Sequence, residues 1–163
     1  MEKTEKTLII TLKRDELAYD IDFITYKVAK VHFMEEAPKV AGEVATDVSD
    51  KDFVDRLLTS GLENIKDELR WCCQWSRANS ANDIVNGCRK DYDLVLSVRK
   101  DWRGSVEVLS SMSHDYLVNY AVFRLLLQVA PNLAPAYASL AESLLHRLYD
   151  YMRVNQRIRQ TLP

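Results

Sequence analysis

Residues 105–159 read SVEVLSSMSHDYLVNYAVFRLLLQVAPNLAPAYASLAESLLHRLYDYMRVNQRIR, and this stretch predicts a helical hairpin. Apolar side chains recur in its first half at steps of three or four residues, the spacing of one face of an α-helix. The pattern stops at Pro131, because proline lacks the N–H that a helix uses and disfavours helical geometry in the residue before it. The second half repeats the same spacing, and two helices joined by a short turn pack antiparallel. The apolar positions are Leu109, Met112, Tyr116, Tyr120, Phe123 and Leu127, then Tyr137, Leu140, Leu144, Leu148 and Tyr151.

The composition favours one mainly helical domain over residues 1–163. A chain of 163 residues with 47% hydrophobic content is long enough for one core. Only four glycines and four prolines are present, too few for the many tight turns of an all-β protein. A net charge of −2 argues against a general nucleic-acid-binding protein, which normally has a basic excess.

Two short segments outside the hairpin predict strands. Residues 8–12 form a β-branched run between charges, and residues 92–99 alternate polar and apolar side chains with the period of a half-buried strand. Each is the natural partner of the other. A helix over 14–34 follows the first strand, with Asp15 and Glu16 in its first turn, where the helix dipole favours negative charge.

The middle of the chain predicts an acidic loop and a long helix. Acidic residues dominate 35–48, while helical spacing runs from 49 to 77, about 43 Å at 1.5 Å per residue. That length exceeds the diameter of about 25 Å expected for a compact domain of this size. Trp71 and Trp75 lie four residues apart near its end, where they either cap the core or meet a partner. The expected fold is therefore a mainly α helical bundle with a long central helix, a C-terminal hairpin and a small two-stranded β element.

No leader or membrane segment is expected. Residues 1–7 are charged, and no apolar run approaches the 18 to 20 or so residues of a membrane span. We therefore expect the protein in the cytoplasm. The cysteines number three, and Cys72 and Cys73 are adjacent, which predicts reduced, buried thiols rather than a mutual disulfide.

The sequence shows no catalytic, cofactor-binding or metal-binding motif. His32, His114 and His146 each stand apart from other ligand residues, and the four glycines stand singly, so neither a metal spacing nor a phosphate loop is present. We expect no enzyme activity. An enzyme would need a deep polar pocket that assembles distant residues around His114 or His146.

Residues 153–163 form a basic C-terminal tail. Arg153, Arg157 and Arg159 lie in it, and no acid follows Asp150. Cations at a helix C-terminus favour the helix dipole, and the same charges suit docking to an acidic surface or nucleic acid. Both interpretations stay open.

The hairpin resembles a known class of phage protein. Residues 113–152, SHDYLVNYAVFRLLLQVAPNLAPAYASLAESLLHRLYDYM, are similar to the C-terminal part of small structural proteins of tailed phages and prophages of gut bacteria. Residues 10–29, ITLKRDELAYDIDFITYKVA, resemble their strand-then-helix start. Residues 45–69 resemble the acidic segment and helix of helical head-to-tail connector (adaptor) proteins, which form rings beneath the portal. The matching positions are His114, Asp115, Tyr116, Leu117 and Val118 for a short cluster, and Arg153, Arg157 and Arg159 for the tail.

The resemblance implies a virion neck protein. It would form a homo-oligomeric ring of about twelve copies, assembled in the bacterial host cytoplasm. Its partners would be the portal protein and a tail or neck protein, with DNA only passing through the ring and no membrane contact. The interface residues would be Trp71, Trp75, Arg153, Arg157 and Arg159. The alternative is a helical protein-protein interaction module or regulator that binds one cellular partner through the Trp71 and Trp75 face.

Overall fold

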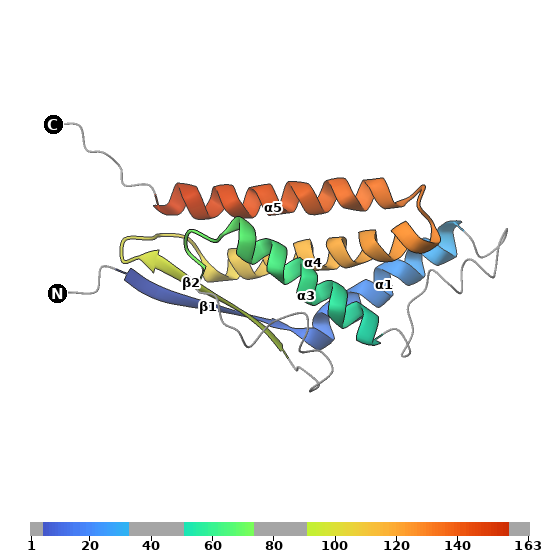
Figure 1. Ribbon diagram of the computed structural model, residues 1–163, viewed down its shortest axis with the longest axis horizontal. Helices are drawn as coiled ribbons and strands as arrows, with labels where there is room; N and C mark the ends of the chain where they lie inside the picture. Colours follow the sequence, from blue (N-terminus) through green and yellow to red (C-terminus); the bar gives the residue numbers. More distant parts are fainter. Residues whose placement is uncertain (1–4, 33–50, 74–90, 157–163) are drawn as a thin grey trace.

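The computed structural model describes residues 5–32, 51–73 and 91–156 and shows a mainly helical fold with a small antiparallel sheet (Figure 1). This confirms the predicted fold class. In chain order the elements are β1 (Glu5–Lys13), α1 (Arg14–His32), α3 (Lys51–Glu68), β2 (Asp91–Arg99), α4 (Val106–Val129) and α5 (Ala134–Gln156).

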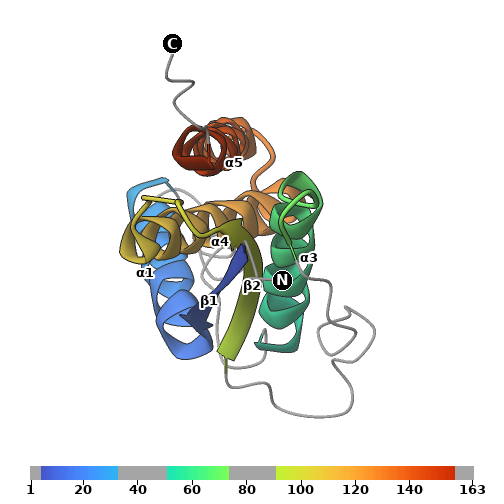
Figure 2. The same cartoon turned by 90° about the vertical axis from the view of Figure 1, so that its left-hand side faces the viewer.

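Helix α4 is the centre of the fold. It contacts α5, α3, α1 and β1, with α1 and α3 on different sides of it and α5 on the face away from the sheet (Figure 2). Ser105 caps its start, accepting a hydrogen bond from the Val108 N–H through its hydroxyl. Because α4 is covered from several directions, it buries more than the predicted stripe. Its buried residues include Leu109, Tyr116, Leu117, Ala121, Val122 and Leu126.

The two predicted strands pair with each other. β1 and β2 run antiparallel, with Leu8 opposite Leu96 and Ile10 opposite Leu94. These side chains face the helices, and those of the alternate residues face outward. Both strands extend slightly beyond the predicted ranges of 8–12 and 92–99.

Helix α3 is shorter than predicted. It ends at Glu68, and the chain then turns, with the Cys72 N–H donating to the Leu69 carbonyl. Cys73 forms an isolated bridge with Leu96 of β2. The helical spacing continues through the turn because Leu69 and Cys72 are buried in the core, so periodicity alone missed the end. Burial also raises the pKa of the Cys72 thiol to about 12.

The helical hairpin turns where Pro131 predicts it. The Ala130 N–H donates to the Leu126 carbonyl as the last bond of α4, and α5 begins three residues after the proline. Helix α5 packs almost wholly on α4. Its buried stripe is formed by Ala134, Ala141, Leu148 and Met152. This stripe is rotated from the predicted one, so Leu140 is exposed.

Some predicted features lie outside the described residues. These are the acidic loop over 35–48, residues 33–34 of the first predicted helix, residues 49–50 and 74–77 of the predicted long helix with Trp75, and tail residues 157–163. Arg153 is described and belongs to the last turn of α5. Among the described helices, none is both long and apolar enough to cross a membrane.

Candidate protein-protein interface

Helix α1 carries an exposed aromatic face, made of Tyr19, Phe23 and Tyr26. Steps of four and three residues place these rings on one side of the helix, opposite the buried Leu17 and Ile21. Their exposed fractions are 69%, 51% and 47%. The Tyr19 and Phe23 rings stack with centroids 6.5 Å apart. We call these three residues the α1 aromatic face.

An exposed aromatic cluster of this kind is typical of an interaction site. Monomeric proteins rarely leave contiguous apolar patches in water, and aromatic residues are enriched where proteins meet. Lys27 places its Nζ 5.3 Å from the Phe23 ring centroid and adds a cation to the same surface. The sequence signal for this face is the spacing of Tyr19, Phe23 and Tyr26. The buried residues of the helix have the same spacing, so the sequence does not show that these three aromatic side chains face water.

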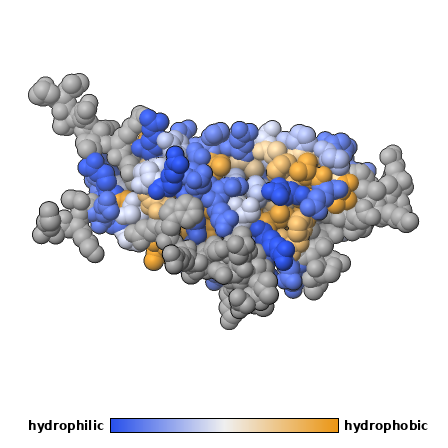
Figure 3. Space-filling model, in the orientation of Figure 1, coloured by the Kyte–Doolittle hydropathy of each residue, from blue (hydrophilic) through white to orange (hydrophobic). Residues whose placement is uncertain are grey.

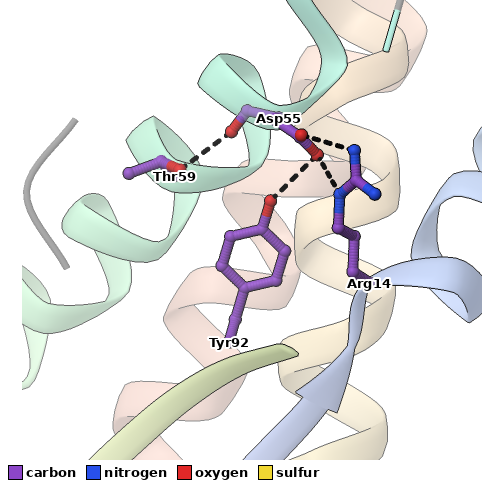
Figure 4. A network of polar contacts seen from close by, with 4 residues as sticks. All are labelled: Arg14, Asp55, Thr59 and Tyr92. Carbon is purple, nitrogen blue, oxygen red and sulfur yellow. Dashed lines mark hydrogen bonds and ion pairs between the residues drawn. The ribbon is translucent and has the colours of Figure 1, made fainter. Parts of the chain in front are cut away.

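The start of α1 is anchored by a polar network that joins it to α3 and β2 (Figure 4). Arg14 donates two hydrogen bonds to the Asp55 carboxylate, from Nε at 2.6 Å and from Nη2 at 2.5 Å. The Tyr92 hydroxyl donates to the same carboxylate at 3.3 Å. Thr59 donates to the Asp55 backbone carbonyl at 2.8 Å. The network thereby fixes the helix that presents the α1 aromatic face.

The network shifts the pKa of two members. The hydrogen bond from Arg14 to Asp55 raises the pKa of the guanidinium, although partial burial opposes this. Burial is the main cause that raises the pKa of the Tyr92 hydroxyl, and the negative charge of Asp55 adds to it. Tyr92 is only 2% exposed, so its phenolate would be poorly solvated.

The raised pKa of Tyr92 predicts a loss of stability in alkali. The unfolded chain ionises this tyrosine near its ordinary pKa of 10.0, while the folded chain keeps it neutral to higher pH. Its contribution is therefore complete below pH 10 and is lost as pH rises through the folded pKa. Urea unfolding at pH 9 to 12 should show that the free energy of unfolding falls less steeply with pH in Tyr92→Phe than in the wild type. Equal slopes for the two proteins would contradict the assignment.

His114 links α4 to α1. Its Nε2 lies 2.7 Å from Oδ2 of Asp20. Two open grooves meet at this histidine, one beside β1 and one along the first turns of α1. Neither is an enclosed polar pocket, and the Asp20 side chain is about half exposed. Within the described residues, no group of three or more His, Cys, Asp or Glu side chains is placed to hold a metal ion.

The residues that follow His114, 115–118, point in several directions. Asp115 is exposed, while Tyr116 is buried and accepts a hydrogen bond from Asn64 Nδ2 at 3.2 Å. Leu117 and Val118 belong to the core. The cluster therefore does not form one surface site.

Two of the predicted interface residues can be placed. Trp71 lies just after α3, is 44% exposed and meets the Tyr149 ring edge-on with centroids 6.5 Å apart. Arg153 is exposed one helical turn beyond Tyr149. We call Trp71, Tyr149 and Arg153 the Trp71 surface. Trp75, Arg157 and Arg159 lie outside the described residues.

Further apolar side chains reach the surface near the α4–α5 turn. Figure 3 shows hydrophobic residues gathered on one face towards this end of the molecule. Leu127 and Leu140, each about half exposed, lie on the two helices that meet there. The exposed apolar area is therefore spread over several elements.

No protein-family model, curated protein or solved structure matches this chain. A functional assignment therefore depends on the surfaces described above.

Proposed function

We propose that the chain is a non-enzymatic structural protein of a phage virion, a head-to-tail connector that forms a ring between portal and tail. The observation that carries this proposal is the α1 aromatic face, three aromatic side chains exposed on one helix. The resemblance of the hairpin supports the phage assignment. It also supports a location in the virion neck.

A closed ring needs two different surfaces on each subunit, because every copy contacts its neighbours head to tail. The α1 aromatic face and the Trp71 surface meet this need. The first lies on α1, and the second lies on the turn after α3 and on the end of α5. Helices α1 and α3 lie on different sides of α4 (Figure 2). Trp71 and Tyr149 would stack with Tyr19 or Phe23 of the next copy, and Arg153 would lie over one of these rings.

The same aromatic face supports one alternative function. A single exposed helix side with anchors at steps of four and three residues also suits docking into a groove of one cellular partner. The two functions differ in stoichiometry, because a connector forms rings and a regulator forms a small complex. They also differ in gene neighbours, since a portal, capsid or tail gene beside this one favours the connector.

Mass photometry tests the connector directly. The protein is measured at rising concentration, alone and with the portal protein encoded nearest to it. We expect a ring-sized species, either alone or on the portal. A protein that stays smaller than a ring at every concentration and ignores the portal would contradict the proposal.

A further inference from the structure

Strand β1 has an edge that no described residue pairs with, and the backbone groups along it can be assigned. The Ser97 N–H donates to the Cys72 carbonyl at 2.6 Å, so it points away from β1. Ser97 and Thr7, which lie opposite each other, therefore form a non-hydrogen-bonded pair of the ladder. The backbone groups of successive residues point to opposite edges of a strand. The N–H and C=O groups of Thr7, Ile9 and Thr11 therefore point away from β2.

No described residue satisfies this edge. Within 5–32, 51–73 and 91–156 the sheet has two strands, and no backbone hydrogen bond reaches the outer groups of β1. Helix α4 does not close the edge either, because an open groove lies between β1 and Val106, Ser110 and His114. An exposed strand edge is a template for another strand.

We propose that this edge pairs antiparallel with β1 of a second copy, in the register that places Ile9 opposite Ile9. This register pairs all nine residues of β1. It also places the residues whose backbone N–H and C=O groups point away from β2 opposite each other, so that these groups can bond between the two copies. The result is a four-stranded sheet in the order β2, β1, β1, β2, with a two-fold axis at Ile9.

The side chains on the outer face support this register. At its centre a row of four aliphatic residues forms, because Val95 lies beside Ile9 in each copy. Next to it, Thr7 faces the second copy's Thr11. At each end, Glu5 faces the second copy's Lys13, and in the register within each copy Glu5 lies opposite Arg99 and Lys13 lies opposite Asp91. The end rows therefore alternate in charge across all four strands: Arg99, Glu5, Lys13 and Asp91.

Other registers lose this complementarity. A shift of two residues in one direction places Glu5 opposite Thr11 and leaves Lys13 without a partner strand residue. A shift in the other direction places Thr7 opposite Lys13 and leaves Glu5 unpaired. Opposite charges facing each other across strands are favourable and like charges are not, so the complete register is preferred.

This contact goes beyond the proposed ring. It is isologous, because the same strand is used on both copies, and it closes as a dimer. Ring formation through the α1 aromatic face uses other residues. Either contact can therefore fail without the other.

Disulfide trapping tests the register. Cys72 and Cys73 are buried, and the third cysteine, Cys88, lies outside the described residues. Thr7→Cys and Thr11→Cys are therefore made separately in a Cys88→Ser background, and each is oxidised alone and in an equal mixture. In the proposed register residue 7 lies opposite residue 11, at about 5.5 Å between Cα atoms, within disulfide range. Two copies of residue 7 lie about 13 Å apart along the strands, too far for a bond. We expect a cross-linked dimer only in the mixture. No cross-link, or equal cross-linking of each variant alone, would overturn the proposal.

Charge reversal gives a second test that does not depend on oxidation. Glu5→Lys and Lys13→Glu should each weaken the dimer about tenfold in sedimentation velocity, because each change creates two like-charge pairs. The double variant restores opposite charges between the two copies. Each substituted side chain then lies opposite a like charge of its own copy, Arg99 or Asp91, but this pair is present in monomer and dimer alike. The dissociation constant should therefore return to within about threefold of the wild-type value. Lys51→Glu, at an exposed position on α3, is the matched control and should change nothing. Failure of the double variant to recover would overturn the register.

Discussion

The Asp55→Ala variant is expected to lose about 3 kcal/mol of its free energy of unfolding. Asp55 accepts hydrogen bonds from Arg14 and Tyr92, and the side chains of Arg14 and Asp55 are 20% and 19% exposed. Without the carboxylate, a mostly buried guanidinium and a buried hydroxyl lose their partner. The loss lies at the lower end of the range for buried ion pairs because some water still reaches these groups. Urea denaturation with circular dichroism measures it.

Two further variants show whether the ion pair is responsible. Asp55→Asn keeps the shape and one acceptor oxygen, so it should lose less than Asp55→Ala. Glu142→Ala removes an exposed contact with His146, with Oε1 and Nε2 3.8 Å apart, and should change stability by less than about 0.5 kcal/mol. If Asp55→Ala behaves like Glu142→Ala, the network does not anchor α1.

The Gly104→Ala variant is expected to lose about 2 kcal/mol of its free energy of unfolding. A Cβ at this position would lie 2.1 Å from Cζ2 of Trp102, well inside van der Waals contact. The Trp102 ring is buried, and Lys6 lies against it with Nζ 5.3 Å from the ring centroid. The same lysine donates to the Trp102 carbonyl at 3.0 Å. The ring therefore has little room to move, and the added methyl displaces it. Urea denaturation of the variant and the wild type measures this difference.

Arg103→Ala is the matched control, since Arg103 is the exposed neighbour in the same loop. Its stability should stay within about 0.5 kcal/mol of the wild type. Equal stability of Gly104→Ala and the wild type would show that Trp102 repacks freely.

Local patterns predicted most of the fold. The period of the apolar residues and Pro131 located the α4–α5 hairpin, and the alternation over 92–99 located β2. The end of α3 was missed, because Leu69 and Cys72 stay buried beyond it and continue the helical spacing. Periodicity reports which side chains are buried and does not show where the backbone leaves the helix.

The interface was harder to predict. The tryptophans and arginines were chosen by residue type, and of these Trp71 and Arg153 are both exposed near one end of α5. The α1 aromatic face needed the structure, because Tyr19, Phe23 and Tyr26 have helical spacing whether they face the core or water. The Arg14–Asp55 pair spans 41 residues, so no local pattern indicates it.

Native mass spectrometry of Phe23→Glu tests the central claim, that the α1 aromatic face is the assembly surface. Phe23 lies in the middle of this face, and Val31→Glu is the matched control because Val31 is exposed on another side of the same helix. We expect ring-sized assemblies for the wild type and Val31→Glu, alone or with the portal protein, and their loss for Phe23→Glu with its fold intact by circular dichroism. Rings of equal abundance in all three proteins, or rings in none, would contradict the account.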